Sequence, residues 1–396
     1  MNRGAAAASV VAAVVVVVGC HPPGPVTSAS AGPPPPAVEI APPPAASSAP
    51  ALAAVSPAAE IEFSPDGRSF AAVVDGVVLV DSATGQLLAT FPHCATKVDF
   101  RADGRELAVL GCADPAGPMI FLWDLRTHGV REIGRVHGAF DAVTYLTGDS
   151  TLGLTGVDAA VMRLSDGHVD VRGSEASTCT ALTFDAAAVR MLSSPRLEDD
   201  CEGQARVLDA GRKVLWHGEK GESAELSPDG RFVAYEEEDG VAVQAIDGGA
   251  LPARPAGPSQ LLGWSPSGKH LALGSEAGGV WFVDAHGAIE CAVHGVGENH
   301  EPVTIHWADG DGRATVVIDL PMLHSMVALW EVKDCRATKT FSLDGRVAAL
   351  SGDLERLAYV HAEWKSPGET PTEQLRIRRV ADGSEIELPA PVRTKE

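Results

Sequence analysis

Short apolar runs alternate with polar turns along residues 59–396, and one four-part phrase recurs there. In the copy EFSPDGRSFAAVVDGVVLVDSATG, an apolar strand ends in a Ser-Pro-Asp-Gly turn and a second apolar strand follows. A Gly or Asp turn then leads into a third strand ending near an Asp, and a last Gly turn opens a fourth. The copy ELSPDGRFVAYEEEDGVAVQAIDGG begins almost identically. Such short runs between turn residues predict β-strands rather than helices.

The repeated turn has a clear physical basis. In the first copy, Ser64 supplies a side-chain oxygen, Pro65 fixes φ, and Gly67 closes a tight hairpin after Asp66. A later copy repeats all four residues, and the next repeats three of them: Ser227, Pro228, Asp229, Gly230, then Ser265, Pro266, Ser267, Gly268. Each copy therefore predicts a β-hairpin.

Weaker copies of the hairpin fill the gaps between the clear ones. They centre on an acidic residue in each case: Asp103, Asp149, Asp185, Asp309 and Asp353. Together the copies make about eight units with a period of roughly 42 residues, the spacing typical of propeller blades. The sequence thus predicts an all-β fold, a β-propeller with eight four-stranded blades, and seven blades is the alternative.

These motifs resemble known repeat families. FSPDGR at Phe63–Arg68, followed by IFLWDLRTHG at Ile120–Gly129, resembles the WD-repeat superfamily. LSPDGRFVAY at Leu226–Tyr235 is similar to the repeats in the propeller of the periplasmic Tol-system protein. LVDSATGQLLATF at Leu79–Phe91 resembles the blade motif of quinone-type propellers and of a β-barrel-assembly lipoprotein. The resemblance covers residues 59 to about 390 and implies the fold, because the shared residues build blades and serve many activities.

The N-terminus predicts export. Residues 1–19 hold one basic residue, Arg3, followed by a short apolar run, which is typical of a secretory signal rather than a membrane span. Val17, Val18 and Gly19 precede Cys20, and this tetrapeptide resembles the lipobox of bacterial lipoproteins. The resemblance implies cleavage before Cys20 and its lipidation; an ordinary signal peptide is the alternative. By the same analogy, His21 rather than Asp after the cysteine favours the outer membrane.

Residues 20–58 predict a tether. After Cys20 the composition turns to Pro, Ala and Ser, as in GPPPPAVEIAPPPAASSAP. Such a segment cannot bury a core and favours extended polyproline-II structure. At ~3.1 Å per residue it reaches on the order of 100 Å, enough to hold the domain at 59–396 away from a membrane.

The charge disfavours one class of partner. The chain carries a net charge of −22, and an acidic surface repels nucleic acid and anionic lipid head groups. We therefore expect no nucleic-acid partner and membrane contact through the N-terminal lipid alone. Solubility is the simplest explanation for most of these charges.

Six further cysteines suggest disulfides, because an even number in an exported chain permits pairing. Cys94 and Cys112 lie nine residues before and after Asp103, so they face each other across a hairpin turning there. Cys179 and Cys201 bracket the hairpin of the fourth unit. Elimination leaves Cys291 with Cys335. None of these cysteines has the CxxC spacing of a redox or zinc site.

Most aromatic residues have a packing role in this interpretation. Five occupy one equivalent position on predicted first strands: Phe63, Phe100, Phe184, Trp264 and Trp307. Three fall in predicted third strands: Trp123, Trp281 and Trp330. Three histidines, His137, His217 and His294, follow strands at blade junctions, where WD-repeat blades commonly place a structural histidine. We therefore expect no metal site from them.

Catalytic motifs are missing from the sequence. It contains no G-x-S-x-G elbow, no H-E-x-x-H and no Gly-rich phosphate loop opening a helix. The sequence therefore predicts no enzyme, no catalytic residues and no cofactor.

Two acidic segments remain as a candidate partner-binding face. They are expected in equivalent loops of adjacent blades, and therefore on one face of the ring: Glu198, Asp199, Asp200 and Glu202, then Glu236, Glu237, Glu238 and Asp239. Such a patch attracts a basic protein segment or a calcium ion. A solvated acidic surface is the third interpretation.

Together these features predict a lipid-anchored cell-envelope propeller that acts as a non-catalytic protein–protein interaction scaffold. We expect it in the periplasm, attached to the outer membrane. The alternative is a propeller enzyme or a ligand or metal sensor that uses the central channel. A surface lipoprotein without a fixed partner is a third possibility.

Overall fold

A computed structural model describes most of the region predicted to fold. The described residues are 59–73, 76–174, 180–195, 204–220, 223–237, 240–247, 260–275, 279–293, 303–308, 311–320, 324–363 and 372–388. All of them lie in one unit, Ala37–Glu396.

The described residues are almost entirely β-strand. The strands of the first half are β1 (Glu60–Phe63), β2 (Ser69–Val73), β3 (Val77–Asp81), β4 (Leu87–Thr90), β5 (Ala95–Phe100), β6 (Glu106–Gly111), β7 (Met119–Asp124), β8 (Val130–Arg135), β9 (Phe140–Tyr145), β10 (Thr151–Gly156), β11 (Asp158–Arg163), β12 (Val169–Ser174), β13 (Thr180–Phe184), β14 (Arg190–Pro195), β15 (Gln204–Asp209) and β16 (Val214–Lys220). Those of the second half are β17 (Ala224–Leu226), β18 (Phe232–Glu237), β19 (Gly240–Ala245), β20 (Gln260–Trp264), β21 (His270–Gly274), β22 (Val280–Asp284), β23 (Ile289–Val293), β24 (Val303–Trp307), β25 (Arg313–Leu320), β26 (His324–Glu331), β27 (Arg336–Leu343), β28 (Gly345–Leu350), β29 (Arg356–Glu363), β30 (Thr372–Arg379) and β31 (Glu385–Glu387). A 3₁₀ helix, η1 (Val332–Asp334), is the only helix of this part of the chain.

The strands pair antiparallel with their neighbours in sequence. Four-stranded sheets form from β1–β4, β5–β8, β20–β23, β24–β27 and β28–β31. β9–β12 and β13–β16 are also antiparallel sets of four, and one pairing between Gly156 and Leu182 joins them. β17–β19 form a three-stranded sheet; the fourth strand expected there falls in residues 248–259, outside the described residues. The four-stranded antiparallel blade expected from the sequence is confirmed.

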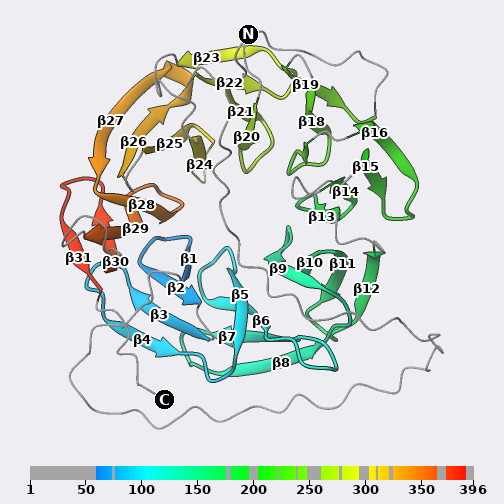
Figure 1. The fold of residues 1–396 in the computed structure, drawn as a ribbon. Helices are drawn as coiled ribbons and strands as arrows, with labels where there is room; N and C mark the ends of the chain where they lie inside the picture. The colour runs from blue at the N-terminus through cyan, green and yellow to red at the C-terminus, as the bar shows by residue number, and fades with distance from the viewer. Residues whose placement is uncertain are drawn as a thin grey trace, which may run out of the picture. The chain divides into compact units, whose positions relative to one another are not determined.

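The sheets stand around a ring like the blades of a propeller (Figure 1). The opening strand of each set, such as β1, β5, β9 or β28, lies nearest the middle, and β4, β8, β12, β27 and β31 lie at the rim (Figure 1). We call β1, β5, β9, β13, β17, β20, β24 and β28 the first strands. First strands from different sheets therefore lie close together around the middle of the ring, although they are far apart in sequence (Figure 1).

Buried apolar side chains fill the space between successive sheets. One cluster joins the first sheet to the last: Phe70 of β2 is fully buried and shares it with Leu375 and Ile377 of β30. Comparable clusters join β1–β4 to β5–β8 and β20–β23 to β24–β27. Because each sheet buries both faces, its middle strands are apolar throughout, as in the second strand FAAV after Ser69. Packing between the two ends of this unit closes the ring.

The recurring turn explains the hairpins. In the first copy, Ser64 Oγ donates to Asp66 Oδ1 at 2.8 Å, the Ser69 N–H donates to Ser64 Oγ at 3.0 Å, and the Gly67 N–H donates to the Ser64 carbonyl at 2.8 Å. Gly67 has φ of 65°, a left-handed conformation that glycine adopts at little cost. In weaker copies Asp149, Asp311 and Leu354 take this position with φ of 54–58°. The degenerate copies therefore keep the geometry and lose only the preferred residue.

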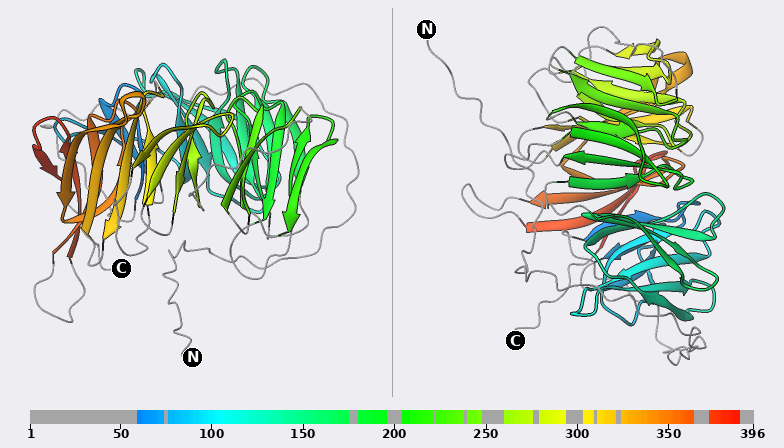
Figure 2. Two further views of the ribbon diagram at one scale, coloured as in Figure 1. Left: turned by 90° about the horizontal axis from the view of Figure 1, so that it is seen from above. Right: turned by 90° about the vertical axis from the view of Figure 1, so that its right-hand side faces the viewer.

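Antiparallel pairing gives the ring two faces. Seen from the side, the strands run across the thickness of the ring, so the connections emerge on opposite faces (Figure 2). The first-turn face carries the turns between first and second strands, and these turns touch: the Thr147 N–H donates to the Ala186 carbonyl at 2.7 Å. We call the face of the connections between second and third strands the second-turn face.

The aromatic residues lie where the sequence predicted. Phe63 and Phe100 are 6% exposed, Trp264 is 9% exposed, and Phe184 and Trp307 are partly buried against neighbouring clusters. Trp123, Trp281 and Trp330 lie in the third strands β7, β22 and β26. The chain is an all-β protein with the β-propeller fold, and the number of blades stays a prediction.

Candidate functional site

Several predicted site residues lie outside the described part of the chain. They are Cys20, Cys179, Cys201, Glu198, Asp199, Asp200, Glu202, Glu238 and Asp239. The signal peptide (1–19) and the tether (20–58) also lie outside it. These predictions therefore remain predictions.

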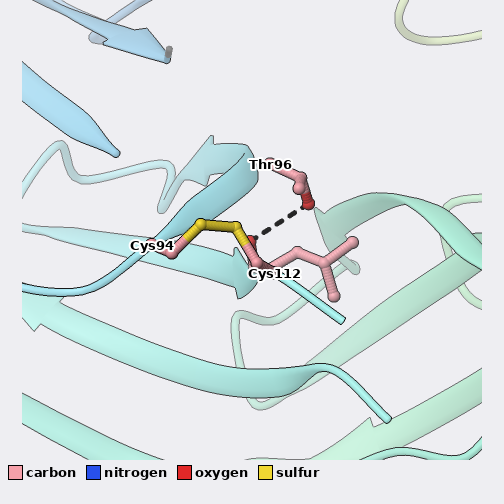
Figure 3. Close-up of a disulfide and its surroundings, with 4 residues drawn as sticks. Cys94, Thr96 and Cys112 are labelled. Atoms are coloured by element: carbon pink, nitrogen blue, oxygen red, sulfur yellow. Dashed lines mark hydrogen bonds between the residues drawn. A yellow bond between two sulfur atoms is a disulfide. The ribbon is translucent and has the colours of Figure 1, made fainter. Parts of the chain in front are cut away.

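The structure contains the disulfide Cys94–Cys112. The two Cα atoms are 5.5 Å apart, and the Cys112 N–H donates to the Cys94 carbonyl at 3.3 Å. Thr96 Oγ1 donates to the Leu110 carbonyl beside it at 3.3 Å (Figure 3). The cross-link therefore closes the open end of the β5–β6 hairpin, opposite its turn, as the spacing of the cysteines around Asp103 predicted.

A second disulfide, Cys291–Cys335, joins two different sheets. Cys291 is buried in β23 at the rim of one sheet, and Cys335 is exposed between η1 and β27 of the next. The Cα atoms are 5.2 Å apart, and 44 positions separate the residues in sequence. This cross-link reinforces an interface between sheets.

The acidic segment at Glu236 and Glu237 differs from the expectation. Both residues were predicted in a loop, but they end strand β18, where they pair with Val241 and Gly240 of β19. Glu236 also accepts a hydrogen bond at 2.8 Å from the Leu261 N–H of β20. Its carboxylate therefore holds β20, the first strand of the next sheet, near the second-turn face.

The first strands lie nearest the middle of the ring, and their penultimate residues occupy equivalent positions in sequence (Figure 1). We call this set the inner ring: Glu62, Asp99, Thr144, Thr183, Glu225, Gly263, His306 and Ala349. Ala349 is the exception in its surroundings, because it is buried in the cluster between the first and last sheets. Alternation along the strand explains the polar members of the inner ring, since in β1 Ile61 and Phe63 are buried while Glu62 between them is exposed. The inner ring was not predicted from the sequence, although an alignment of the repeat copies on their turns brings Glu62, Asp99, Glu225 and His306 to one position.

Glu62 and Asp99 are carboxylates held at unusual pKa values. Burial, together with the negative charges of Asp99 and Glu60, raises the pKa of Glu62 to about 7. Glu62 is exposed, and the protein groups packed around its carboxyl still disfavour the charged form. Burial also raises the pKa of Asp99 to about 6, although the backbone N–H groups of Tyr145 and Phe100 oppose this shift. Two neighbouring acids therefore titrate close to neutral pH.

Glu225 and His306 extend the same environment around the inner ring. Burial and the charge of Glu236 raise the pKa of Glu225, and a hydrogen bond from the Trp264 backbone opposes the rise. Burial lowers the pKa of His306 against the opposing effect of Asp319. Because Glu236 interacts with Glu225, the acidic end of β18 is electrostatically continuous with the inner ring.

One cation balances part of this charge. Lys97 of β5 pairs with Glu60 of β1 at 2.5 Å. Within the described residues, no lysine or arginine forms an ion pair with Glu62, Asp99 or Glu225. Glu62 and Asp99 therefore form one pair of interacting carboxylates, and Glu225 and Glu236 form another.

The three histidines at the predicted blade junctions stay a prediction as structural residues. His137 and His217 are exposed, and His294 lies outside the described residues. Across the ranges that the structure describes, no group of three or more His, Cys, Asp or Glu residues has the arrangement to hold a metal ion.

A cavity of about 240 Å³ lies between the β9–β12 and β13–β16 sets. Its polar lining includes Thr144 and Thr183 of the inner ring and Thr155 of β10, and its apolar lining includes Tyr145 and Phe184. It offers hydroxyl groups and two aromatic rings to a small molecule.

The ring of antiparallel sheets and the recurring turn define a β-propeller. No protein-family model and no curated protein sequence matches the chain. Among solved structures it is similar to a eukaryotic initiation factor, at 13% identity and a TM-score of 0.55, over 87% of this chain and 91% of that one. It is also similar to the dihydro-heme d1 dehydrogenase NirN in complex with DHE, at 15% identity and a TM-score of 0.53, over 89% of this chain and 78% of that one. The Swd1 β-propeller domain of Myceliophteria thermophila aligns at 15% identity and a TM-score of 0.40, over 65% and 92%. At these identities the first two likenesses show a shared fold.

Proposed function

We propose that this propeller is a lipid-anchored, non-catalytic scaffold of the cell envelope that captures a basic segment of a partner protein. The binding surface in this proposal is the acidic inner ring, Glu62, Asp99 and Glu225, with the adjoining end of β18 at Glu236 and Glu237. The signal predicted at residues 1–19, the lipobox resemblance at Cys20 and the tether predicted at residues 20–58 support export and anchoring. In the described part of the chain, no helix is long and apolar enough to cross a membrane.

One observation carries the proposal: Asp99 repels Glu62 across neighbouring first strands, and neither carboxylate forms an ion pair with a lysine or arginine of the described residues. The pKa of Glu62 near 7 and that of Asp99 near 6 mean that ionisation is unfavourable in the free protein. A lysine or arginine brought to this place favours the ionised forms and lowers both pKa values. Binding of a basic segment is therefore coupled to proton release and strengthens as pH rises through 6 to 7.

A direct test uses the full chain and a lysine-rich peptide as probe. We expect saturable binding that weakens with added salt and is several-fold tighter at pH 8 than at pH 5.5. Glu62→Gln should weaken binding at pH 8 and reduce its pH dependence. Glu132→Gln removes the same charge from the rim strand β8, where Glu132 is exposed, and should leave binding unchanged.

Cellular partners are tested by cross-linking in intact cells. The anchored protein should capture specific partners whose recovery falls in the Glu62→Gln variant and not in Glu132→Gln. A Cys20→Ala form serves as the unanchored control. Equal capture by all charge variants, or peptide binding that ignores pH, would remove the inner ring from the proposal.

A second candidate function is a ligand sensor or enzyme acting near the inner ring. The cavity of about 240 Å³ beside Thr144 and Thr183 favours it, and so do carboxylates that titrate near neutral pH, since general acids and bases work best there. One fold neighbour is a dehydrogenase by its description. Native mass spectrometry of the purified full chain tests this candidate: a bound small molecule or metal that is lost in Thr183→Trp would favour it over the scaffold.

A further inference from the structure

The ring closes where the first sheet meets the last, and an arginine lies at that seam on the first-turn face. Arg356 begins β29, and its Nη1 donates at 2.6 Å to the carbonyl of Gly67 in the first turn of the β1–β4 sheet. The neighbouring Ser82 Oγ donates to the same carbonyl at 2.5 Å. One side chain from the last sheet and one from the first therefore bind the same backbone oxygen at the seam.

The chain contains the same arrangement at a second place. Arg190 begins β14, and its Nη1 donates to the Gly230 carbonyl in the first turn of the next sheet. Here, however, the guanidinium also forms an ion pair: Nη2 lies 2.5 Å from Asp247 Oδ2. Arg190 thus binds a carbonyl with one arm and a carboxylate with the other.

The residue equivalent to Asp247 at the closing seam is Ala83. The register follows from matching backbone bonds, because the Ile246 N–H donates to the Arg231 carbonyl and the Ser82 N–H donates to the Arg68 carbonyl, each at 2.9 Å. The residues that follow, Asp247 and Ala83, are both exposed. Within the described residues no carboxylate forms an ion pair with Arg356.

A cavity of about 220 Å³ lies beside Arg356 and Ala83, where a carboxylate equivalent to that of Asp247 is missing. Arg356 and Arg379 line it with positive charge, and Ser82 and Ser384 line it with hydroxyl groups. Ile377 and Ile386 form an apolar wall. In a chain with a net charge of −22, two arginines facing one cavity are a local reversal of charge.

Nearby acids neutralise this charge only in part. Asp382 lies 3.5 Å from Arg379 Nη1, and both side chains are more than half exposed, so the pair is weak. The carboxylate of Asp353 lies near Gly67, but it accepts hydrogen bonds from Ser351 Oγ at 2.5 Å and from the Glu355 N–H at 2.9 Å in its own turn. Among the described residues, Arg356 therefore forms no ion pair with a carboxylate.

We infer that this seam cavity is a binding site for a small oxyanion, a carboxylate or a phosphate group, whose oxygens take the place that Asp247 fills beside Arg190. Guanidinium groups bind both anions through paired N–H donors. The isoleucine wall accommodates a short apolar part of the ligand. This site lies apart from the inner ring and is independent of the partner capture proposed above.

The test is calorimetric titration of the full chain with inorganic phosphate, acetate and butyrate. We expect one site per chain. Tighter binding of butyrate than of acetate would assign the site to an organic carboxylate, and binding of phosphate alone would assign it to a phosphate group. Arg356→Gln should weaken binding at least about tenfold, the loss expected for a charged hydrogen-bond donor.

Two exchanges between the equivalent seams sharpen the test. Ala83→Asp supplies an internal carboxylate at an exposed position, so it should abolish anion binding and raise the melting temperature measured without anion. Asp247→Ala should leave the stoichiometry at one, because the strand partner of Arg190 is the acidic Asp209, whereas that of Arg356 is the basic Arg379. Absence of binding by all three anions to the wild-type chain would overturn the inference, and so would undiminished binding by Ala83→Asp.

Discussion

Removal of the disulfide between sheets should destabilise the propeller more than removal of the disulfide within a hairpin. Cys291–Cys335 spans 44 positions and joins two sheets, whereas Cys94–Cys112 spans 18 and joins paired strands. In the loop-entropy model, these separations correspond to about 4 and about 3 kcal/mol of stabilisation at 25 °C. The longer cross-link restricts the unfolded chain more.

The expected changes in melting temperature follow from the size of the domain. At about 2.1 cal/mol/K per residue, a domain of roughly 340 residues unfolds with an entropy of about 0.7 kcal/mol/K. Loss of Cys291–Cys335 should therefore lower the melting temperature by about 6 °C, and loss of Cys94–Cys112 by about 4 °C.

Cys335→Ala is the cleanest perturbation of the longer cross-link. Cys335 is exposed and has φ of 48°; alanine keeps its Cβ, so the backbone cost of this left-handed conformation stays the same. Cys291 stays buried as a thiol, and no cavity forms. The matched variant is Cys94→Ala, because Cys94 is also exposed.

Differential scanning calorimetry of the full chain, with and without reductant, measures both effects. Reductant should lower the melting temperature of the wild-type chain and should change each variant less. The reasoning would be refuted if Cys335→Ala melted at the wild-type temperature, or if it cost less than Cys94→Ala in repeated scans.

Three further outcomes are expected. The pKa of Glu62 is raised from 4.5 to about 7 in the folded protein, so the native state binds this proton more tightly and loses stability as pH rises from about 4.5 through 7. In denaturant titrations, Glu62→Gln should therefore be more stable than wild type at pH 8 and equal to it at pH 4. A difference that stays constant with pH would contradict the assignment. Phe70→Ala should cost about 3–5 kcal/mol in chemical denaturation, because Phe70 is fully buried where the first and last sheets meet, and a cost below about 1 kcal/mol would mean that the cluster repacks. Cys20→Ala should move the protein from the membrane fraction to the soluble fraction of cells, whereas continued attachment would argue against lipidation.

The fold could be predicted because its signals are local. The turn at Ser64–Gly67 requires specific residues for its hydrogen bonds and its left-handed φ, so each copy marks a hairpin wherever it occurs. The disulfide Cys94–Cys112 was predictable for the same reason, since both cysteines belong to one hairpin. Where Asp149 or Leu354 replaces the glycine, the motif weakens although the geometry persists.

The inner ring and the seam cavity were harder to predict because they depend on several sheets at once. A residue such as Glu62 looks like an ordinary exposed position of an alternating strand, and only the ring arrangement places Asp99 near it. The acidic segment at Glu236 was recognised, but its bond to the Leu261 N–H depends on a strand of the next sheet. Sequence patterns report the faces of a strand, and not which strands approach each other.

Differences between equivalent positions carry the functional information in this repetitive chain. Positions that the fold requires are filled by similar large apolar residues, such as Phe63, Phe100 and Trp264 at the ends of first strands, and such positions cannot distinguish one propeller from another. Equivalent positions that the fold does not constrain can hold different residues, and the residue at such a position can be compared with its counterpart in another copy. Arg190 forms an ion pair with Asp247 at its seam, whereas Ala83 at the equivalent position offers Arg356 no carboxylate. Because the backbone contacts are the same at both seams, stability of the turn alone does not explain the missing carboxylate, and the external anion that we propose would explain it.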